Sequence, residues 1–126
     1  MSNLFSPLRI RGITLKNRIA VSPMCQYSCD DGIVTDWHLV HLGTRAIGGA
    51  ALILTEATAV APEGRISPQD AGIWNNTQAD AFRKIADFIS SANTIPGIQL
   101  AHAGRKASTY APGKGDGEVM PENGGW

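Results

Sequence analysis

Residues 50–60, AALILTEATAV, constrain the fold most, because they are apolar at nearly every position. A short apolar run of this kind is typical of a strand buried on both faces of a parallel sheet. Parallel strands are joined by crossover connections, usually helices, that cover the sheet. The run therefore predicts an α/β fold, with helices in the segments on either side of it.

The segment before this strand predicts a hairpin, a strand and a helix. Residues 8–17 form two alternating runs, LRIRG and ITLKN, as in a β-hairpin, and RIAVS at 18–22 reads as a strand. Thr35 or Asp36 can cap a helix that ends at the glycine pair 48–49. Four residues of this helix fall on one face: Trp37, Val40, Thr44 and Ile47.

The segment after the strand predicts a loop, a second helix and a third strand. Thr77 and Asp80 resemble a capping box at the start of a helix over residues 77–93, which we expect Pro96 and Gly97 to close. GIQLAHAGR, at 97–105, reads as a short strand that runs into a loop. The apolar stripe of the helix consists of Phe82, Ile85, Ala86 and Ile89.

The predicted order of strands and helices is β-α-β-α-β, which implies a parallel sheet with right-handed crossovers. A complete (β/α)₈ TIM barrel needs about 250 residues, and this chain has 126. We therefore expect the N-terminal part of one barrel domain, with about three parallel strands and two helices. Residues 1–17 would form the bottom hairpin, 18–105 the first β/α units and 106–126 a loop.

The composition argues against several classes of partner. Eleven basic and eleven acidic residues leave no net charge, so the electrostatic footprint of a nucleic-acid-binding protein is absent. No stretch approaches the roughly 20 apolar residues of a membrane span, and MSNLFSPLRI lacks the pattern of a secretion signal. We expect a cytoplasmic protein without a nucleic-acid or membrane partner, whose two cysteines are reduced thiols.

Ligands of α/β folds bind beyond the carboxyl ends of the strands, so the residues that follow each strand are candidates for a site. SPMCQY at 22–27 follows the first strand, and Glu56 and Gln99 lie near the ends of the next two. Each also has a structural explanation: Met24 and Cys25 as core residues, and Glu56 and Gln99 as polar groups bonded to loop backbone. His102, in HAGR, is by itself more typical of a structural histidine.

A zinc-binding module is an alternative, since Cys25, Cys29, His38 and His41 resemble a Cys₂His₂ set. Its spacing is unfavourable. Eight residues separate Cys29 from His38 and two separate the histidines, where about 12 and three to five are usual. Glycine motifs of dinucleotide-binding and P-loop folds are absent from the sequence.

Three segments carry a resemblance to a known family: LKNRIAVSPMCQYS, EATAVAPEGRISPQDAGIW and GIQLAHAGRKAS. In this order and spacing they resemble the N-terminal part of the Old Yellow Enzyme family of flavin-dependent ene-reductases. The likeness is to its thermophilic-like class, which includes xenobiotic reductases and NADPH dehydrogenases. The resemblance implies a (β/α)₈ barrel that binds FMN. The flavin N5 would accept hydride from NADPH or NADH and deliver it to an activated alkene, such as an α,β-unsaturated carbonyl or a nitro compound.

Residue by residue, the resemblance implies that Cys25 interacts with the flavin and tunes its potential, and that Tyr27 points at the substrate. Ala57 would approach the flavin through its backbone, and Gln99 would bond the pyrimidine edge, for which an amide supplies donor and acceptor. The wall along the ring would consist of Ser22, Pro23, Met24 and Cys25. The proton donor and the phosphate ligands would come from later strands, so no catalytic acid is assigned.

The resemblance also implies that the whole protein forms a homo-oligomer, a dimer or a tetramer. The main alternative to this reading is an inactive fragment of such an enzyme that binds no flavin.

Overall fold

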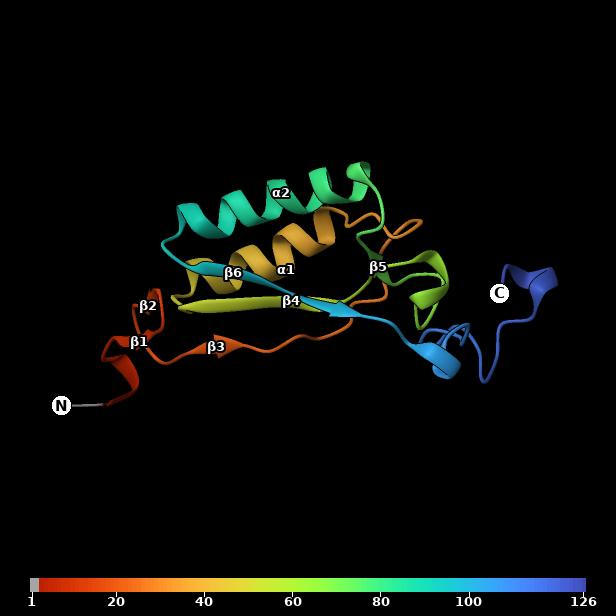
Figure 1. The fold of residues 1–126 in the computed structure, drawn as a ribbon, viewed down its shortest axis with the longest axis horizontal. Coiled ribbons are helices and arrows are strands. Elements are labelled where there is room, and N and C mark those ends of the chain that lie inside the picture. Colours follow the sequence, from red (N-terminus) through yellow and green to blue (C-terminus); the bar gives the residue numbers. More distant parts are fainter. Residues whose placement is uncertain (1–2) are drawn as a thin grey trace.

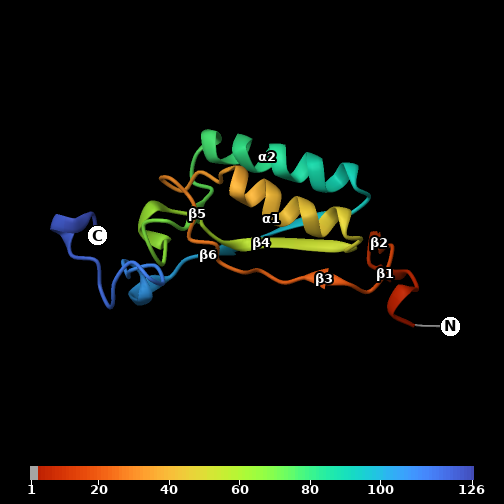
Figure 2. The ribbon, with the colours of Figure 1, turned by 180° about the vertical axis from the view of Figure 1, so that it is seen from behind.

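The computed structural model describes residues 3–126 of the chain. Two helices lie side by side over one face of a parallel sheet, with a small hairpin at one end and the C-terminal segment at the other (Figures 1 and 2). The predicted alternation of parallel strands and helices is confirmed. Residues 1–2 of the segment predicted as a hairpin lie outside the described residues.

Strand β1 (Leu8–Ile10) pairs antiparallel with β2 (Ile13–Leu15), as the alternating runs predict. Two side chains tie the end of this hairpin segment to the main sheet. Lys16 Nζ donates to the Ala92 carbonyl and to Thr94 Oγ1, both at 3.2 Å, and Asn17 Nδ2 donates to the Gly49 carbonyl at 2.8 Å. The hairpin therefore closes the end of the sheet at which the parallel strands begin (Figure 1).

Strand β4 (Leu52–Ala59) is the centre of the four-stranded sheet. It pairs in parallel with β3 (Ala20–Val21) near its start, with β5 (Ala71–Gly72) near its end, and with β6 (Ile95–Ala101) along most of its length. The buried apolar run thus forms the central strand, as predicted. The segment predicted as a loop after β4 contains β5 and a 3₁₀ turn, η2 (Pro62–Gly64).

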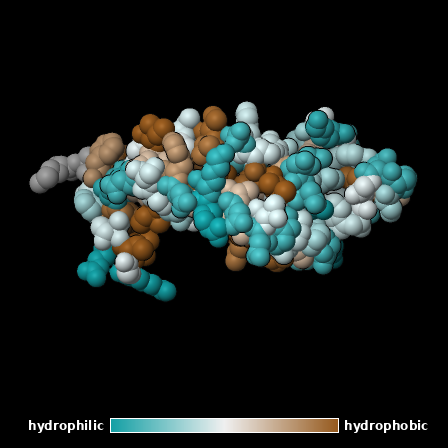
Figure 3. All heavy atoms as spheres, turned by 90° about the horizontal axis from the view of Figure 1, so that it is seen from above, coloured by the Kyte–Doolittle hydropathy of each residue, from teal (hydrophilic) through white to brown (hydrophobic). Residues whose placement is uncertain are grey.

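Helix α1 (Asp36–Ile47) begins after Thr35 and ends at Gly48, as predicted. The face marked by Trp37, Val40 and Ile47 is exposed, with exposed fractions of 58%, 61% and 71%. The apolar side chains that face the core are instead Leu42 and Ala46. The opposite side packs inward, because Gly43 lets the helix approach α2 closely. A Cβ atom at Gly43 would lie 2.8 Å from the Phe88 ring. Seen from the helix side, hydrophobic residues accordingly appear among hydrophilic ones on the surface (Figure 3).

Helix α2 (Asn76–Ser91) begins at a different cap residue from the one predicted. Its N-cap is Asn75, whose side chain accepts a hydrogen bond from the Gln78 backbone at 3.0 Å, so the predicted capping box of Thr77 and Asp80 is wrong. Asp80 instead pairs with Arg83. The predicted stripe is confirmed for Phe82, Ile85 and Ile89, which are buried, while Ala86 is half-buried.

The prediction that Pro96 and Gly97 close α2 is wrong, because both residues lie inside β6. The helix ends earlier, at Ala92, and the chain enters the strand through Thr94, whose hydroxyl donates to the Ala50 carbonyl at 2.6 Å. Gly97 packs closely in the strand: a Cβ atom there would lie 2.5 Å from the Leu54 side chain, which would have to shift. Proline is tolerated near the first residue of a strand.

The core lies between β4 and the two helices. It is closed by apolar side chains from all of these elements, chiefly Leu42, Ala46, Ile53, Phe82, Ile85 and Ile89. Three further 3₁₀ turns are η1 (Asn3–Phe5), η3 (Gly104–Lys106) and η4 (Pro121–Asn123). Over residues 3–126, no helix is both long enough and apolar enough to cross a membrane.

Candidate functional site

The ends of three parallel strands meet at one edge of the sheet. Ala57 of β4 lies opposite Gln99 of β6 in the strand register. Strand β3 pairs with the beginning of β4, and residues 22–27 continue from it along the same sheet toward this edge (Figure 1). Three predicted site segments, far apart in the sequence, are thus neighbours in the structure.

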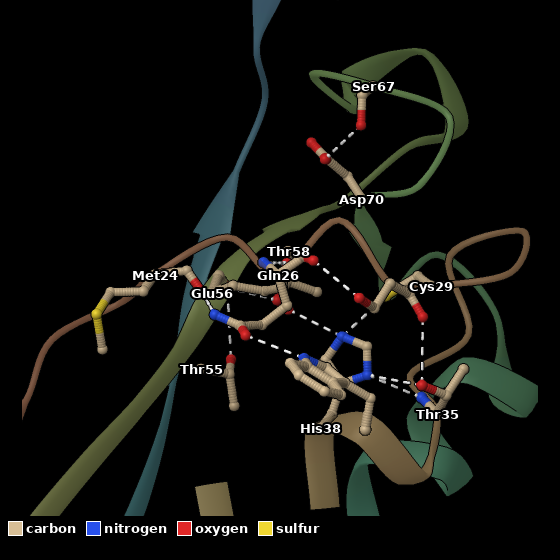
Figure 4. Close-up of polar contacts among 12 residues, drawn as sticks. Met24, Gln26, Cys29, Thr35, His38, Thr55, Glu56, Thr58, Ser67 and Asp70 are labelled. Carbon is tan, nitrogen blue, oxygen red and sulfur yellow. Dashed lines mark hydrogen bonds and ion pairs between the residues drawn. The ribbon is translucent and has the colours of Figure 1, made fainter. Parts of the chain in front are cut away.

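Most predicted site residues present some surface at this edge. Met24, Ser22 and Gln99 are exposed, and the side chain of Met24 is drawn pointing away from the polar network (Figure 4). Four others are half-buried: Pro23, Cys25, Tyr27 and Ala57. The edge therefore offers apolar, thiol, phenol and amide groups to a ligand.

The thiol of Cys25 lies in an environment that keeps it protonated. Burial raises its pKa above the ordinary value of 9.0, and the negative charges of Asp70 and Glu56 raise it further. A hydrogen bond from the Ala57 backbone opposes this shift in part. Cys25 is thus a neutral, polarizable group next to the backbone of Ala57.

Tyr27 shares this environment. Burial raises the pKa of its phenol, and the negative charges of Asp70 and Glu56, with that of Cys25 once its thiol is ionised, raise it further. Its backbone has φ = 50°, in the left-handed region that residues other than glycine rarely adopt. The chain around Tyr27 must therefore hold an unfavourable backbone conformation.

Glu56 is the buried anchor of the site, with 4% of its surface exposed. Its Oε2 accepts from the backbone N–H of Gln26 at 3.0 Å, and its Oε1 lies 3.0 Å from Nε2 of His38. Figure 4 shows His38 reaching from α1 toward Glu56 while the Gln26 segment crosses above it. The carboxylate thus joins β4, α1 and the segment after β3. Sequence analysis flagged Glu56 only as a polar group that needs partners.

The hydrogen bonds of His38 fix its tautomer. Nδ1 accepts from the backbone N–H of Thr35 at 2.9 Å, and an N–H group can only donate. The proton of the neutral ring therefore lies on Nε2, which donates it to Glu56. The sulfur of Cys29 lies 3.4 Å from the same nitrogen and is a weak acceptor there.

The same tautomer argues against a metal centre. Cys29, His38 and Glu56 offer ligand atoms within 4.8 Å of one another. A metal on Nε2 would move the ring proton to Nδ1, where it would face the Thr35 N–H. Burial also raises the pKa of the Cys29 thiol strongly, so the thiolate that a metal requires is disfavoured. The zinc alternative is therefore poorly supported, and this cluster includes neither Cys25 nor His41.

Asp70 is a second buried carboxyl near the site, and sequence analysis missed it. It accepts from Ser67 Oγ at 2.8 Å and from the Ile66 backbone at 2.7 Å. Burial raises its pKa, and these hydrogen bonds oppose the rise. The motif SPQD, a serine three residues before an aspartate in a loop, is the sequence signal that local side-chain bonding leaves.

The loop that carries Asp70 is held by Arg65, whose guanidinium stacks between two indole rings. Its distances to the ring centres are 5.2 Å for Trp74 and 4.9 Å for Trp126. His102, by contrast, accepts from the Gly104 backbone at 3.0 Å and stabilises a local turn. That His102 is structural stays a prediction.

Comparison with known proteins identifies the family. The sequence profile of the NADH:flavin oxidoreductase / NADH oxidase family matches residues 3–122. The chain belongs to this family. It is 52% identical over 119 residues to an NADPH dehydrogenase of Geobacillus sp. (strain WCH70), covering 93% of this chain and 33% of that protein. It thus spans about a third of the length of the curated relatives it matches.

Solved structures agree with this assignment. Old Yellow Enzyme from Pichia sp. AKU4542 matches with a TM-score of 0.79 and 31% identity, over 84% of this chain and 28% of that one. Morphinone reductase in complex with tetrahydroNAD matches with a TM-score of 0.78 and 27% identity, over 86% and 29%. The resemblance to the Old Yellow Enzyme family and the fold class, the N-terminal part of a (β/α)₈ barrel, are confirmed.

Replacing Glu56 by glutamine should destabilise the fold. The two N–H donors, Gln26 and His38, approach different carboxylate oxygens, so an amide would place its NH2 group, which only donates, against one of them. We expect the free energy of unfolding to fall by about 1–3 kcal/mol in urea denaturation followed by circular dichroism. Glu63→Gln is the matched control, since it removes an equal charge from an exposed position. Equal stability of E56Q and the wild type would contradict the network.

Alkylation of Cys25 by iodoacetamide should keep accelerating with pH beyond 9.0, because its thiolate forms only above the raised pKa. Cys29 should react far more slowly in the folded chain, because it is 7% exposed. Peptide mass spectrometry resolves the two sites, and the urea-unfolded chain, in which both react alike, is the control. A Cys25 rate that levels off below pH 9.0 in the folded chain is the contrary result.

Proposed function

We propose that this chain forms one side of the flavin site of an FMN-dependent NAD(P)H oxidoreductase that reduces activated C=C bonds. The observation that carries the proposal is the juxtaposition at the sheet edge. Ala57 of β4 pairs with Gln99 of β6, and the segment that carries Cys25 continues from β3, which pairs with the start of β4. Three strands thus bring together the groups that a flavin ring requires. In this proposal, residues 1–126 are the N-terminal part of a single FMN-binding barrel domain.

The chemistry of these residues fits a flavin. Half-buried Pro23 and exposed Met24 offer an apolar wall for a planar ring. The exposed amide of Gln99 offers both a donor and an acceptor, which suits the pyrimidine edge. Ser22 lies at the start of the wall and Ala57 would approach through its backbone. When bound, FMN would supply the hydride-transfer chemistry that links a nicotinamide to an alkene.

The chain's own residues would then bind and orient. Cys25, kept neutral by burial and by two neighbouring carboxylates, would tune the flavin without adding a full charge. Tyr27 would face the substrate, an α,β-unsaturated carbonyl or a nitro compound, with a phenol that burial keeps protonated. The proton donor and the phosphate ligands are proposed to lie in the part of the relatives that this chain does not span.

The remaining proposals follow from the relatives. Proteins at about half identity are named NADPH dehydrogenase, which supports NADPH, or NADH, as reductant. A small-molecule partner, a homo-oligomeric assembly and a location in the cytoplasm are proposed on the same family basis. The alternative is that the 126-residue chain, taken alone, is an inactive fragment that binds no flavin.

Titration of FMN with the 126-residue chain separates these alternatives. We expect saturable quenching of flavin fluorescence, because the residues proposed to contact the ring come from neighbouring strand ends. Gln99→Leu should weaken the binding, since it removes the amide without changing the side-chain size greatly, whereas Ile47→Ala, on the exposed face of α1, should leave it unchanged. Absence of quenching by the wild-type chain would favour the inactive fragment.

Cys25→Ala, made in the complete flavoprotein that carries this segment, tests the tuning role. FMN should remain bound, because the wall and the amide are intact, but its midpoint potential should shift since a polarizable thiol is lost from the ring. Spectroelectrochemical titration measures the potential, and Cys29→Ala, which removes a thiol from the buried cluster, is the control. An unchanged potential in C25A would refute the role.

A further inference from the structure

Gln26 lies between Cys25, which is proposed to face the flavin, and Tyr27, which is proposed to face the substrate. It has no part in either proposed contact. All four of its polar atoms are engaged. Its backbone N–H donates to Glu56 Oε2 at 3.0 Å, and its carbonyl accepts from Ser28 Oγ at 2.8 Å. Its side-chain Nε2 donates to the Met24 carbonyl at 2.8 Å, and its Oε1 accepts from the Trp37 indole at 3.0 Å.

These bonds attach the segment to two different elements. The backbone bond connects it to β4 through Glu56, which is itself bonded to His38 of α1. The side-chain bond connects it directly to the first turn of α1 through Trp37. Gln26 is thus fixed from both ends, while its own side chain clamps the backbone of Met24 (Figure 4).

The hydrogen bond from Trp37 to Gln26 also gives a reason for the exposed tryptophan on α1, which core packing does not. Trp37 is 58% exposed and contributes little to the core, but its indole N–H faces Gln26. Val40, on the same exposed face, makes no comparable polar contact because its side chain is a hydrocarbon. The indole of Trp37 therefore bonds the segment 22–27 and does not pack in the core.

We propose that Gln26 is a positioning residue, which, held by Trp37, fixes the segment so that Cys25 and Tyr27 keep their orientation at the proposed flavin site. This inference rests on the proposed function for what the two side chains face. The left-handed backbone of Tyr27, φ = 50°, gives the physical need: an unfavourable conformation persists only where its neighbours are held.

Gln26→Leu and Trp37→Phe test the proposal, because each removes the amide–indole hydrogen bond while keeping a side chain of similar shape. In the 126-residue chain, W37F should raise the rate of Cys25 alkylation by about two- to tenfold, the range that loss of one hydrogen bond allows. Q26L should raise it at least as much, because it also removes the bond from Gln26 Nε2 to the Met24 carbonyl. Since the two changes break one shared bond, the Q26L/W37F double variant should exceed Q26L by much less than the product of the single effects. Val40→Ala, on the same helix face, is the control and should react like the wild type.

In the complete flavoprotein, both variants should retain FMN but show a shifted midpoint potential. The KM for 2-cyclohexenone, an α,β-unsaturated ketone, should rise by about two- to fivefold, with a smaller change in kcat. Wild-type alkylation rates together with a wild-type potential and KM in Q26L and W37F would overturn the positioning role. A wild-type protein that holds no FMN would instead overturn the proposed function, and the alkylation result would still decide whether Gln26 fixes the segment.

Discussion

The Glu56 carboxylate, 4% exposed, lies where β4, α1 and the segment 22–27 meet. A carboxylate in such a place is tolerated only when each oxygen accepts a hydrogen bond. One bond comes from His38, whose other nitrogen is fixed by the start of α1, and the other comes from the Gln26 backbone. The need to satisfy one buried charge thereby fixes where α1 begins and where the segment after β3 runs.

The same carboxylate shapes the chemistry of the neighbouring edge. Together with Asp70 it adds negative charge around Cys25 and Tyr27, and burial acts in the same direction on both groups. The thiol and the phenol are therefore kept protonated and neutral in a region rich in acceptors. A neutral, polarizable surface next to an apolar wall is suited to an uncharged aromatic ring, which links the buried network to the proposed flavin site.

Sequence patterns predicted the elements better than their ends. The apolar run of β4 and the apolar stripe of α2 predict which side chains are buried, because burial follows from the residue types themselves. The sequence places the start of α2 two residues too late, because asparagine and threonine can both cap a helix. In the structure the Asn75 side chain accepts the hydrogen bond from the Gln78 backbone and is the cap. The sequence pattern of Pro96 and Gly97 predicts a helix end, because their place in β6 depends on pairing with Ile53 and Leu54 of β4, more than forty residues away.

By itself the sequence determined the α/β class, the order of elements, the family and the set of candidate residues at the strand ends, because periodicity and motifs are local. Only the tertiary structure decided that His38, a candidate for zinc, bonds Glu56 and lies against the Cys29 sulfur, and that Gln26 holds the segment between Cys25 and Tyr27. The reason is physical: a tautomer and a hydrogen-bond partner depend on groups brought together from distant parts of the chain, and no spacing along the sequence records that meeting.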